Sequence, residues 1–376
     1  MKVNIIQFDP VIGGETTLCN ALTTILSKKY DIRVIHPVHV SKRGKLKIDK
    51  KWGVVAGEEF LTYEETARAC DDVDIVFCIN AKHVKGSVKS DKRALAQADS
   101  DLFFDQFSNK NFVFYEHGFH TWRLYNYENL FSKLIKKGNT IRVLTNTKMA
   151  IEFYASKGYN AYLCRQPFNT EMYKPIVKND SDTLNICFNS RYSATKGPHI
   201  VLPFFSEFLK KELNFRFNFR GNISDPVSIW HNIKHYFQDP ESEINMKEYA
   251  TDMSEIYNKQ DYCVYAGYLT REERGKIEYA ILEPIFYGIP IIAHPDVFKH
   301  FKYEEYGITP EQLKNSFIEL SAENLRAIIN REFDPSSYAE NAKRILSDFL
   351  PDRISERFSW CLSSPASKGK LIEELF

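Results

Sequence analysis

Residues 277–293 read IEYAILEPIFYGIPIIA, and this stretch decides the fold of the second half of the chain. Two glutamates, Glu278 and Glu283, precede a proline, a short apolar turn, a glycine and an apolar run typical of a buried strand. Pro284 disfavours helical backbone at the residue before it, so we expect Glu283 at the edge of a new helix. A carboxylate placed there can accept both hydroxyls of a ribose. A glutamate that only caps the helix is the alternative.

Upstream of this stretch, residues 184–189 have the composition of a buried strand, and the loop NSRYSATKG follows at residues 189–197. The loop carries Arg191 and Lys196 five residues apart at a strand exit. Two cations in this position can hold a diphosphate and stabilise the charge that develops on it as a leaving group. An ordinary exposed basic loop remains the alternative.

Short apolar runs alternate with amphipathic ones in both halves of the chain, which predicts two doubly wound parallel sheets of the Rossmann type. The expected strands are 3–8, 32–36, 75–80, 112–116, 140–145, 161–165, 184–189, 215–220, 262–265 and 290–293. The expected helices are 16–29, 63–70, 92–107, 130–137, 148–157, 199–213, 271–282, 322–331, 336–349 and 352–359, with Gly158 ending the fifth of them.

The domain prediction follows from the length of 376 residues and from a polar run at residues 178–182. We expect an N-terminal domain over residues 1–170, a linker over 171–183 and a C-terminal domain over 184–350. A helical segment over 351–376 would pack back on the first domain. In sheets of this kind a ligand binds beyond the carboxyl ends of the strands, which here predicts a cleft faced by both domains.

Two further strand exits in the first half carry candidate residues. Gly13 and Gly14 follow the first expected strand and open a helix, where backbone amides and the helix dipole favour a diphosphate. An ordinary strand-to-helix turn fits the same letters. His117 follows the fourth expected strand, with His120 close behind, and its position suits a substrate contact, although a structural histidine is the alternative.

The net charge of +1 hides an asymmetry between the two halves. Residues 1–170 hold 25 Lys and Arg against 18 Asp and Glu, whereas residues 171–376 hold 25 against 31. Such a basic surplus suits a polyanionic acceptor, and a solvated loop kept for solubility is the other interpretation. The basic residues that we expect to contact the acceptor are Lys42, Arg43, Lys45, Lys47, Lys85 and Lys89.

The compartment is predicted from the cysteines and from the apolar runs. The seven cysteines are scattered and include no CxxC pair, which favours buried reduced thiols over disulfides or a zinc site. The apolar start of the chain is too short for a signal peptide, and no run is long enough to cross a membrane. We therefore expect a cytoplasmic protein.

These motifs together resemble the retaining GT-B glycosyltransferases, and among them the DNA α-glucosyltransferases of T-even phages. The 277–293 stretch is similar to their donor-site signature, and the R-x-x-x-x-K-G pattern of Arg191 to Gly197 is similar to their diphosphate-binding pair. The E-Y-x-x-L-E pattern at 278–283, the Y-x-H pattern at 115–117 and the R-G-N turn at 220–222 appear in the same order as in those enzymes.

The resemblance implies a GT-B fold and transfer of a sugar from a UDP-sugar to 5-hydroxymethylcytosine in duplex DNA, with base flipping and retention of configuration. Arg191, Lys196 and His117 would be catalytic. Gly13, Gly14, Gly221, Glu278 and Glu283 would complete the donor site. The resemblance implies no metal and no tightly bound cofactor. A transferase acting on a lipid-linked or cell-surface glycan is an alternative, and a non-catalytic sugar-nucleotide or DNA-binding module is a third possibility.

The chain departs from the resembled pattern at two positions. Gly275 stands where many GT-B enzymes have the first acid of an E-x7-E pair, so Glu278 is either its substitute or an ordinary helix residue. Gly118 stands where the phage enzymes have an acid after the Y-x-H histidine, which leaves the acceptor and the sugar open. Glucose is the sugar that the resemblance implies, and arabinose is the alternative.

Overall fold

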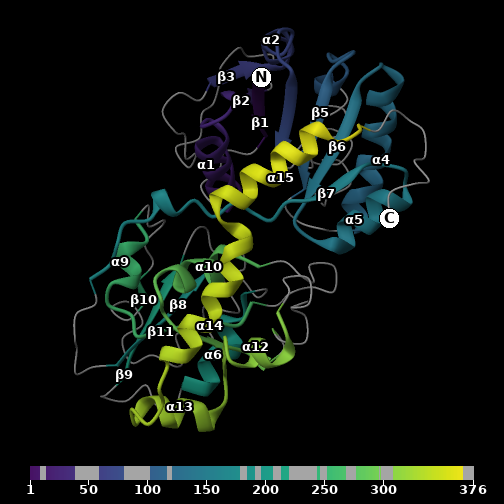
Figure 1. Cartoon of the computed structure of the whole chain (residues 1–376). Helices are drawn as coiled ribbons and strands as arrows, with labels where there is room; N and C mark the ends of the chain where they lie inside the picture. The colour runs from purple at the N-terminus through teal and green to yellow at the C-terminus, as the bar shows by residue number, and fades with distance from the viewer. Residues whose placement is uncertain are drawn as a thin grey trace. The chain divides into compact units, whose positions relative to one another are not determined.

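A computed structural model of the chain describes residues 1–8, 14–38, 59–79, 102–116, 121–177, 184–190, 196–205, 213–219, 244–245, 252–267, 277–295, 297 and 308–366. The chain forms two compact units. Unit 1 comprises Met1–Asn169 together with Pro351–Phe376, and unit 2 comprises Thr170–Leu350. Each unit is built on one parallel sheet, as the alternating sequence pattern predicted (Figure 1).

Unit 1 contains a seven-stranded sheet in the order β3-β2-β1-β4-β5-β6-β7, with every pairing parallel. Its strands are β1 (Lys2–Gln7), β2 (Asp31–Val38), β3 (Glu59–Thr62), β4 (Ile75–Ile79), β5 (Asn111–Glu116), β6 (Thr140–Thr145) and β7 (Ala161–Leu163). Its helices are α1 (Gly14–Leu26), α2 (Tyr63–Ala69), α4 (Thr121–Lys136), α5 (Lys148–Ser156) and α15 (Pro351–Ser363).

Both faces of the unit 1 sheet are buried. Successive side chains of each strand point to opposite sides, and helices cover both sides. In β4, Phe77 packs on the side of α1 and α15, and its neighbours Val76 and Cys78 pack on the side of α4 and α5. Helix α15 closes the first side with the buried residues Ile354, Phe358 and Cys361. The last helix of the described chain thus completes the core of the first unit.

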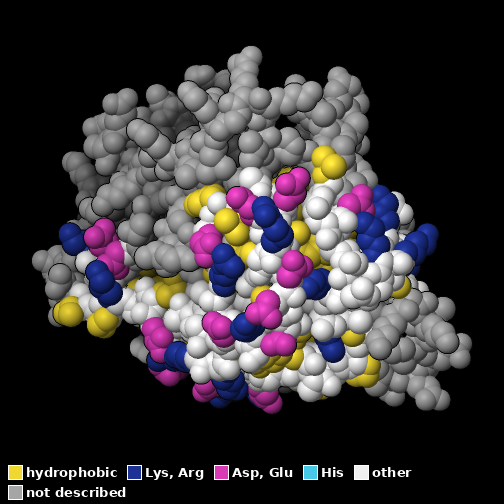
Figure 2. Space-filling model, turned by 90° about the horizontal axis from the view of Figure 1, so that it is seen from above, with side chains coloured by type: hydrophobic (Ala, Val, Ile, Leu, Met, Phe, Trp, Pro, Cys, Tyr) yellow, Lys and Arg dark blue, Asp and Glu magenta, His cyan; other side chains and the backbone are white. Residues whose placement is uncertain are grey.

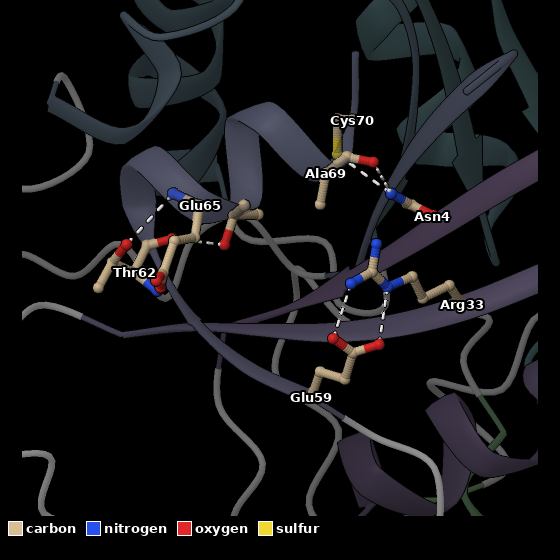
Figure 3. A network of polar contacts seen from close by, with 8 residues as sticks. Asn4, Arg33, Glu59, Thr62, Glu65, Ala69 and Cys70 are labelled. Carbon is tan, nitrogen blue, oxygen red and sulfur yellow. Dashed lines mark hydrogen bonds and ion pairs between the residues drawn. The ribbon is translucent and has the colours of Figure 1, made fainter. Parts of the chain in front are cut away.

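The outer edge of this sheet is fastened by polar contacts that Figure 3 shows from close by. Arg33 of β2 donates two hydrogen bonds to Glu59 of β3, at 2.8 and 2.7 Å. Thr62 then caps α2 in a reciprocal arrangement with Glu65, in which each side chain accepts from the other residue's backbone N–H. Strand β3 was not predicted from the sequence, since it has only four residues and none of them is fully buried.

Unit 2 contains a six-stranded sheet in the order β10-β9-β8-β11-β12-β13, again parallel throughout. Its strands are β8 (Leu184–Ser190), β9 (Leu213–Phe219), β10 (Ile244–Asn245), β11 (Tyr262–Tyr265), β12 (Ile291–Ala293) and β13 (Ile318–Glu319). Its helical segments are η2 (Thr170–Met172), α6 (Pro198–Phe205), α9 (Ser254–Tyr257), α10 (Tyr279–Phe286), α12 (Pro310–Lys314), α13 (Ala322–Ile329), α14 (Ser336–Leu346) and η5 (Ser347–Phe349).

Several predicted boundaries were wrong. The helix expected over 199–213 ends at Phe205, and Leu213 already pairs with β8. The helix expected from residue 130 begins at Thr121, and residues 105–107 lie outside any helix. The helix expected over 336–349 turns into the 3-10 segment η5 at Ser347. Of the helix expected over 271–282, residues 271–276 lie outside the described part of the chain.

The strand order reverses at one place in each sheet, between β1 and β4 in unit 1 and between β8 and β11 in unit 2. Loops that leave neighbouring strands in opposite directions at such a point separate from each other, and ligands bind there. Gly14 begins the helix that follows β1, and Lys196 lies in the connection that follows β8. The fold therefore places both predicted phosphate-binding stretches at a switch point.

Charges of both signs alternate on the described surface. At the amino ends of the unit 1 strands, Lys2 pairs with Asp72 at 2.7 Å and Lys137 with Asp105 at 2.9 Å. Figure 2 shows Lys and Arg side chains interspersed with Asp and Glu over the described part of the face that it draws. Of the basic residues predicted to contact the acceptor, all lie outside the described residues.

The seven cysteines all fall within the described ranges, and each is a buried thiol outside any disulfide, as predicted. Burial raises the pKa of the Cys164 thiol to about 12, so this side chain stays protonated at neutral pH. Among the helices described, none has both the length and the apolar character that crossing a membrane requires.

Candidate functional site

The connection between β8 and α6 packs directly against the backbone that follows β11. Gly197 has a φ of +68°, a left-handed conformation that favours glycine. A Cβ built on Gly197 would lie 2.4 Å from the carbonyl oxygen of Ala266, so no larger residue fits without a backbone shift. The glycine thus brings the connections after two adjacent central strands into contact. Lys196, one residue earlier, is held at this junction.

Lys196 and Tyr265 converge on the carboxylate of Glu278. The Lys196 ammonium pairs with Oε1 of Glu278, and the Tyr265 hydroxyl donates to Oε2 at 2.9 Å. The side chains of Lys196 and Glu278 are only 21% and 18% exposed, so solvent screens this ion pair less than one on the open surface. Gly267 permits the arrangement, because a Cβ there would lie 2.1 Å from the Tyr265 hydroxyl oxygen.

Glu278 is the residue before the first turn of α10, and its side chain makes no capping bond to that helix. Its backbone carbonyl instead accepts from the N–H groups of Ile281 and Leu282, which leaves the carboxylate for Lys196 and Tyr265. The backbone and the side chain of Glu278 therefore make separate contacts. Glu278 begins a helix with its backbone and forms part of a charged cluster with its side chain.

Glu283 lies inside α10, not at the start of a new helix as predicted. The helix begins at Tyr279 and runs through Pro284 to Phe286. Pro284 has no backbone N–H, so α10 lacks one internal hydrogen bond. The burial of Ile281, Leu282 and Ile285 outweighs that loss. The local preference of the residue before a proline is overridden here by packing.

The Glu283 carboxylate is 1% exposed and is met by two phenols. Tyr173 donates to Oε1 at 3.3 Å and Tyr257 donates to Oε2 at 3.5 Å. Burial raises the pKa of the nearby Tyr279 phenol well above its ordinary value, and the charge of Glu283 adds to this shift. A buried carboxylate among phenolic hydroxyls is suited to accept further hydroxyl donors.

An aromatic cluster supports these phenols. The ring of Tyr287 lies 5.3 Å from that of Tyr257 and 6.3 Å from that of Tyr173, and Phe286 completes the group. Asn189, the second-last residue of β8, donates from Nδ2 to the Tyr257 hydroxyl at 2.6 Å. The cluster links β8, α9 and α10 of unit 2, whose positions Figure 1 shows.

The structure brings three of the predicted donor-site residues to the carboxyl end of the unit 2 sheet, namely Lys196, Glu278 and Glu283. Gly14 is the first residue of α1 in unit 1. The remaining predicted site residues lie outside the described ranges; they are Gly13, Lys42, Arg43, Lys45, Lys47, Lys85, Lys89, His117, His120, Arg191 and Gly221.

Sequence reasoning missed Tyr173, Tyr257, Tyr265 and Asn189. Tyr265 and Asn189 stand at strand ends, which is the one signal that points to them. Tyr257 ends the short helix α9 and Tyr173 directly follows η2, and neither belongs to a recognisable motif, so only the fold reveals their contact with Glu283. A search of the described residues for three or more clustered His, Cys, Asp and Glu side chains that could hold a metal ion finds no such group.

An ammonium and two carboxylates at the carboxyl ends of central strands can together bind a ligand that carries both phosphate and hydroxyl groups. Lys196 can supply the charge for a phosphate. Glu283 can supply acceptors for hydroxyls. Because the carbonyl of Ala266 and its neighbours lie beside Gly197, backbone groups are also available at this junction.

Comparison of the whole fold with solved structures finds close likeness to sugar-nucleotide-dependent enzymes of the GT-B class. An alpha-glucosyltransferase in complex with UDP matches with a TM-score of 0.68 at 13% identity, covering 96% of this chain and all of that one. Anabaena HepE, in complex with UDP and glucose, matches with a TM-score of 0.63 at 14% identity, covering 97% of this chain and 100% of that one.

Sucrose-phosphate synthase from Thermosynechococcus elongatus matches as well, with a TM-score of 0.62 at 11% identity over 96% of this chain and 98% of that one. The alpha-glucosyltransferase has also been solved with UDP-glucose and DNA containing an abasic site, and this complex matches at a TM-score of 0.67 and 15% identity, covering 96% of this chain and 100% of that one. No family model and no curated protein sequence matches the chain. The likeness shows the GT-B fold that the sequence motifs predicted.

Proposed function

We propose that the chain is a glycosyltransferase that moves a sugar from a UDP-sugar to 5-hydroxymethylcytosine in DNA. One observation carries the proposal. Lys196, Glu278 and the buried Glu283 lie together at the carboxyl end of the unit 2 sheet, in a fold shared with structures that contain UDP. The motif resemblance that the sequence showed and the fold likeness point to the same kind of donor.

The donor would bind to unit 2. Its diphosphate would contact Arg191 and Lys196, and its ribose hydroxyls would bond to Glu283. Backbone groups near residues 265–270, of which 268–270 lie outside the described ranges, would hold the uracil by resemblance. Lys196 pairs with Glu278, so the diphosphate would share this ammonium with the carboxylate. The amides of Gly13 and Gly14 belong to the proposed donor contacts by resemblance.

The chemistry follows from the charge that develops on the departing diphosphate. As the bond between the sugar C1 and the phosphate oxygen breaks, the cations of Arg191 and Lys196 would stabilise the leaving group. The acceptor hydroxyl oxygen would form the new bond to C1 from the same face, and its proton would pass to the departing phosphate oxygen. Retention of configuration would result. His117 would contact the acceptor hydroxyl or the donor sugar.

The acceptor side rests on the basic surplus of residues 1–170 and on DNA-bound structures of the similar alpha-glucosyltransferase. A hydroxymethyl group on a stacked base cannot enter an enclosed site, so the base would leave the duplex. The bound DNA would be contacted by Lys42, Arg43, Lys45, Lys47, Lys85, Lys89 and His120.

A glycan acceptor is the second candidate. HepE, solved with UDP and glucose, and sucrose-phosphate synthase share the fold at TM-scores close to that of the alpha-glucosyltransferase. The sugar is open in the same way. We take glucose as the expected sugar and arabinose as its alternative.

The experiment that tests the proposal incubates the protein with DNA that contains 5-hydroxymethylcytosine, and with ordinary DNA, in the presence of UDP-glucose or UDP-arabinose. The DNA is then digested, and the nucleoside masses are measured. A glycosylated nucleoside only in the modified DNA supports the proposal. UDP-sugar turnover with a glycan acceptor and none with either DNA would favour the second candidate.

A variant series links the activity to the site. Arg191→Ala and Lys196→Ala should each lower the transfer rate at least a hundredfold, since each removes a cation from the leaving group. Lys343→Ala, in an exposed pair with Glu340 in α14, serves as the matched control and should keep the wild-type rate. Unimpaired turnover in Lys196→Ala would refute the proposed site.

A further inference from the structure

The side chains around Glu283 are connected by a series of hydrogen bonds. Binding of the sugar donor does not by itself require these bonds. Tyr173 directly follows η2, Tyr257 ends α9 and Glu283 lies in α10, so three separate segments converge on one carboxylate. Each phenol donates to a different oxygen. Because each oxygen accepts from one of these phenols, rotation of the carboxylate about its last bond would break both contacts. The two phenols therefore fix its plane.

Asn189 determines which way the Tyr257 hydroxyl points. Its Nδ2 donates to the Tyr257 oxygen at 2.6 Å, and a phenol carries only one hydrogen of its own. Because the oxygen already accepts from Asn189, the hydrogen is directed to its acceptor, Oε2 of Glu283. Tyr257 is fully buried, and its ring packs on Tyr287 at a centroid distance of 5.3 Å. The order Asn189 to Tyr257 to Glu283 is thus held by packing as well as by bonding.

We infer that Tyr257, oriented by Asn189, and Tyr173 are positioning residues that set the plane of the Glu283 carboxylate for recognition of a ribose diol. The inference rests on the proposed function, in which Glu283 binds the donor ribose. Neither tyrosine needs to touch the donor. Their effect passes through Glu283, because two adjacent hydroxyls can bond to one carboxylate only when its plane is correctly turned.

Positioning of this kind predicts a specific signature, which is discrimination between ribose and 2′-deoxyribose. A well-oriented carboxylate gains two hydroxyl contacts from a ribose and only one from a deoxyribose. A carboxylate that can rotate gains less from the second hydroxyl. Loss of a positioning residue should therefore weaken UDP binding more than binding of 2′-deoxy-UDP, whereas general damage to the fold should weaken both equally.

The experiment measures the dissociation constants of UDP and 2′-deoxy-UDP by calorimetry for the full chain and its variants. The wild type should prefer UDP, and Glu283→Gln should lose most of that preference. Tyr257→Phe should lower the ratio of the dissociation constant of 2′-deoxy-UDP to that of UDP about tenfold. This is the amount expected when a hydrogen bond between a hydroxyl and the charged carboxylate is lost. Tyr173→Phe should lower the ratio less, because this side chain is only partly buried.

Two further variants sharpen the test. Tyr262→Phe removes a buried phenol near Asp261 and Asp334 in the same unit, and should leave the ratio unchanged. Asn189→Leu keeps the branched shape without the donor and should reproduce Tyr257→Phe. The double variant should be no worse than either single one, since both act through the same bond.

Thermal unfolding of each variant separates positioning from folding. The inference is overturned if the tyrosine variants lose affinity for both nucleotides by the same factor. It is also overturned if the ratio is unchanged in Tyr257→Phe and Tyr173→Phe while Glu283→Gln loses the preference for UDP. Both outcomes leave the proposed function intact. A wild type that binds no UDP overturns the proposed function, and the inference with it.

Discussion

Arg33 and Glu59 form a bidentate ion pair whose strength depends on pH (Figure 3). The hydrogen bonds from Arg33 lower the pKa of the Glu59 carboxyl below its ordinary value of 4.5. A carboxyl with a depressed pKa stabilises the folded state above its unfolded pKa, and this contribution is lost as the pH falls through the folded pKa. The pair is nearly half exposed, with side chains 42% and 43% accessible, so its contribution is small.

Glu59→Gln should therefore lower the free energy of unfolding by about 0.5–1 kcal/mol at neutral pH. The difference from the wild type should shrink as the pH drops below 4.5 and vanish once Glu59 is protonated in the folded protein. Urea unfolding at a series of pH values measures this. Glu152→Gln, at an exposed site in α5, is the control, and a difference that does not shrink as the pH falls would contradict the assignment.

The residue-scale features of the site differ in how far the sequence could predict them. Glu283 and Lys196 were singled out because their neighbours form motifs. The contact of Lys196 with Glu278 spans 82 residues, and nothing in either motif indicates it. Tyr257 was missed for the same reason, since its role arises only when β8, α9 and α10 have come together.

Elements were predicted well where both faces of a strand are buried. β4 and β5 have continuous apolar runs, and the sequence located both within about one residue. Gly158, at a φ of +79°, ends α5 as predicted. β3, β10 and β13 were missed because two to four residues cannot display a period. The start of α10 was misplaced, since Pro284 gives a local signal that burial overrides.

Two glycines of unit 2 allow an element-scale prediction. Gly197 and Gly288 both have a positive φ, of +68° and +64°, but only Gly197 has backbone atoms against its missing side chain. Gly288→Ala should cost about 1–2 kcal/mol for the left-handed backbone alone. Gly197→Ala should cost more and should also weaken UDP binding, because the Ala266 carbonyl must move and Lys196 is the adjacent residue.

Urea unfolding and UDP titration of both variants check this pairing of glycines. Gly288→Ala is the matched control, as no atom lies within 4 Å of its added Cβ. Equal loss of stability in the two variants would mean that the connection after β8 is not held against the one after β11.

The whole chain passes between the units twice, because unit 2 is inserted between residue 169 and residue 351 of unit 1. α15 then completes the core of unit 1, where Phe358 packs between Tyr30 and Phe77 at centroid distances of 5.5 and 5.3 Å. Pro351 suits the first position of this helix, where no backbone N–H is needed.

Phe358→Ala should lower the stability of unit 1 by about 3–5 kcal/mol, the usual cost of a cavity left by a buried aromatic ring. Trp360→Ala, in the same helix but 48% exposed, should cost less although the side chain is larger. Denaturant unfolding followed by limited proteolysis assigns the loss to a unit. A greater effect of Trp360→Ala would show that α15 packs on unit 1 differently.

The charge asymmetry gives a second prediction at this scale. If the basic surplus of residues 1–170 binds DNA, replacing Lys42, Arg43, Lys45 and Lys47 together by Ser should weaken DNA binding and flatten its salt dependence. Each phosphate contact that is lost should reduce the slope of log K against log salt by about 0.9. The slope is measured in a titration from about 50 to about 200 mM salt. An unchanged slope would exclude these residues from the interface.

The return of α15 to unit 1 also affects how the chain folds during synthesis on the ribosome. A nascent chain that has reached residue 350 already contains every described strand of both sheets, yet the side of the unit 1 sheet on which α1 packs still lacks Phe358 and Cys361 of α15. Unit 2 can fold at this stage, since its residues are continuous in the chain. Until α15 is synthesised, the apolar residues of unit 1 that it covers remain exposed, and exposed apolar surface of this kind favours aggregation.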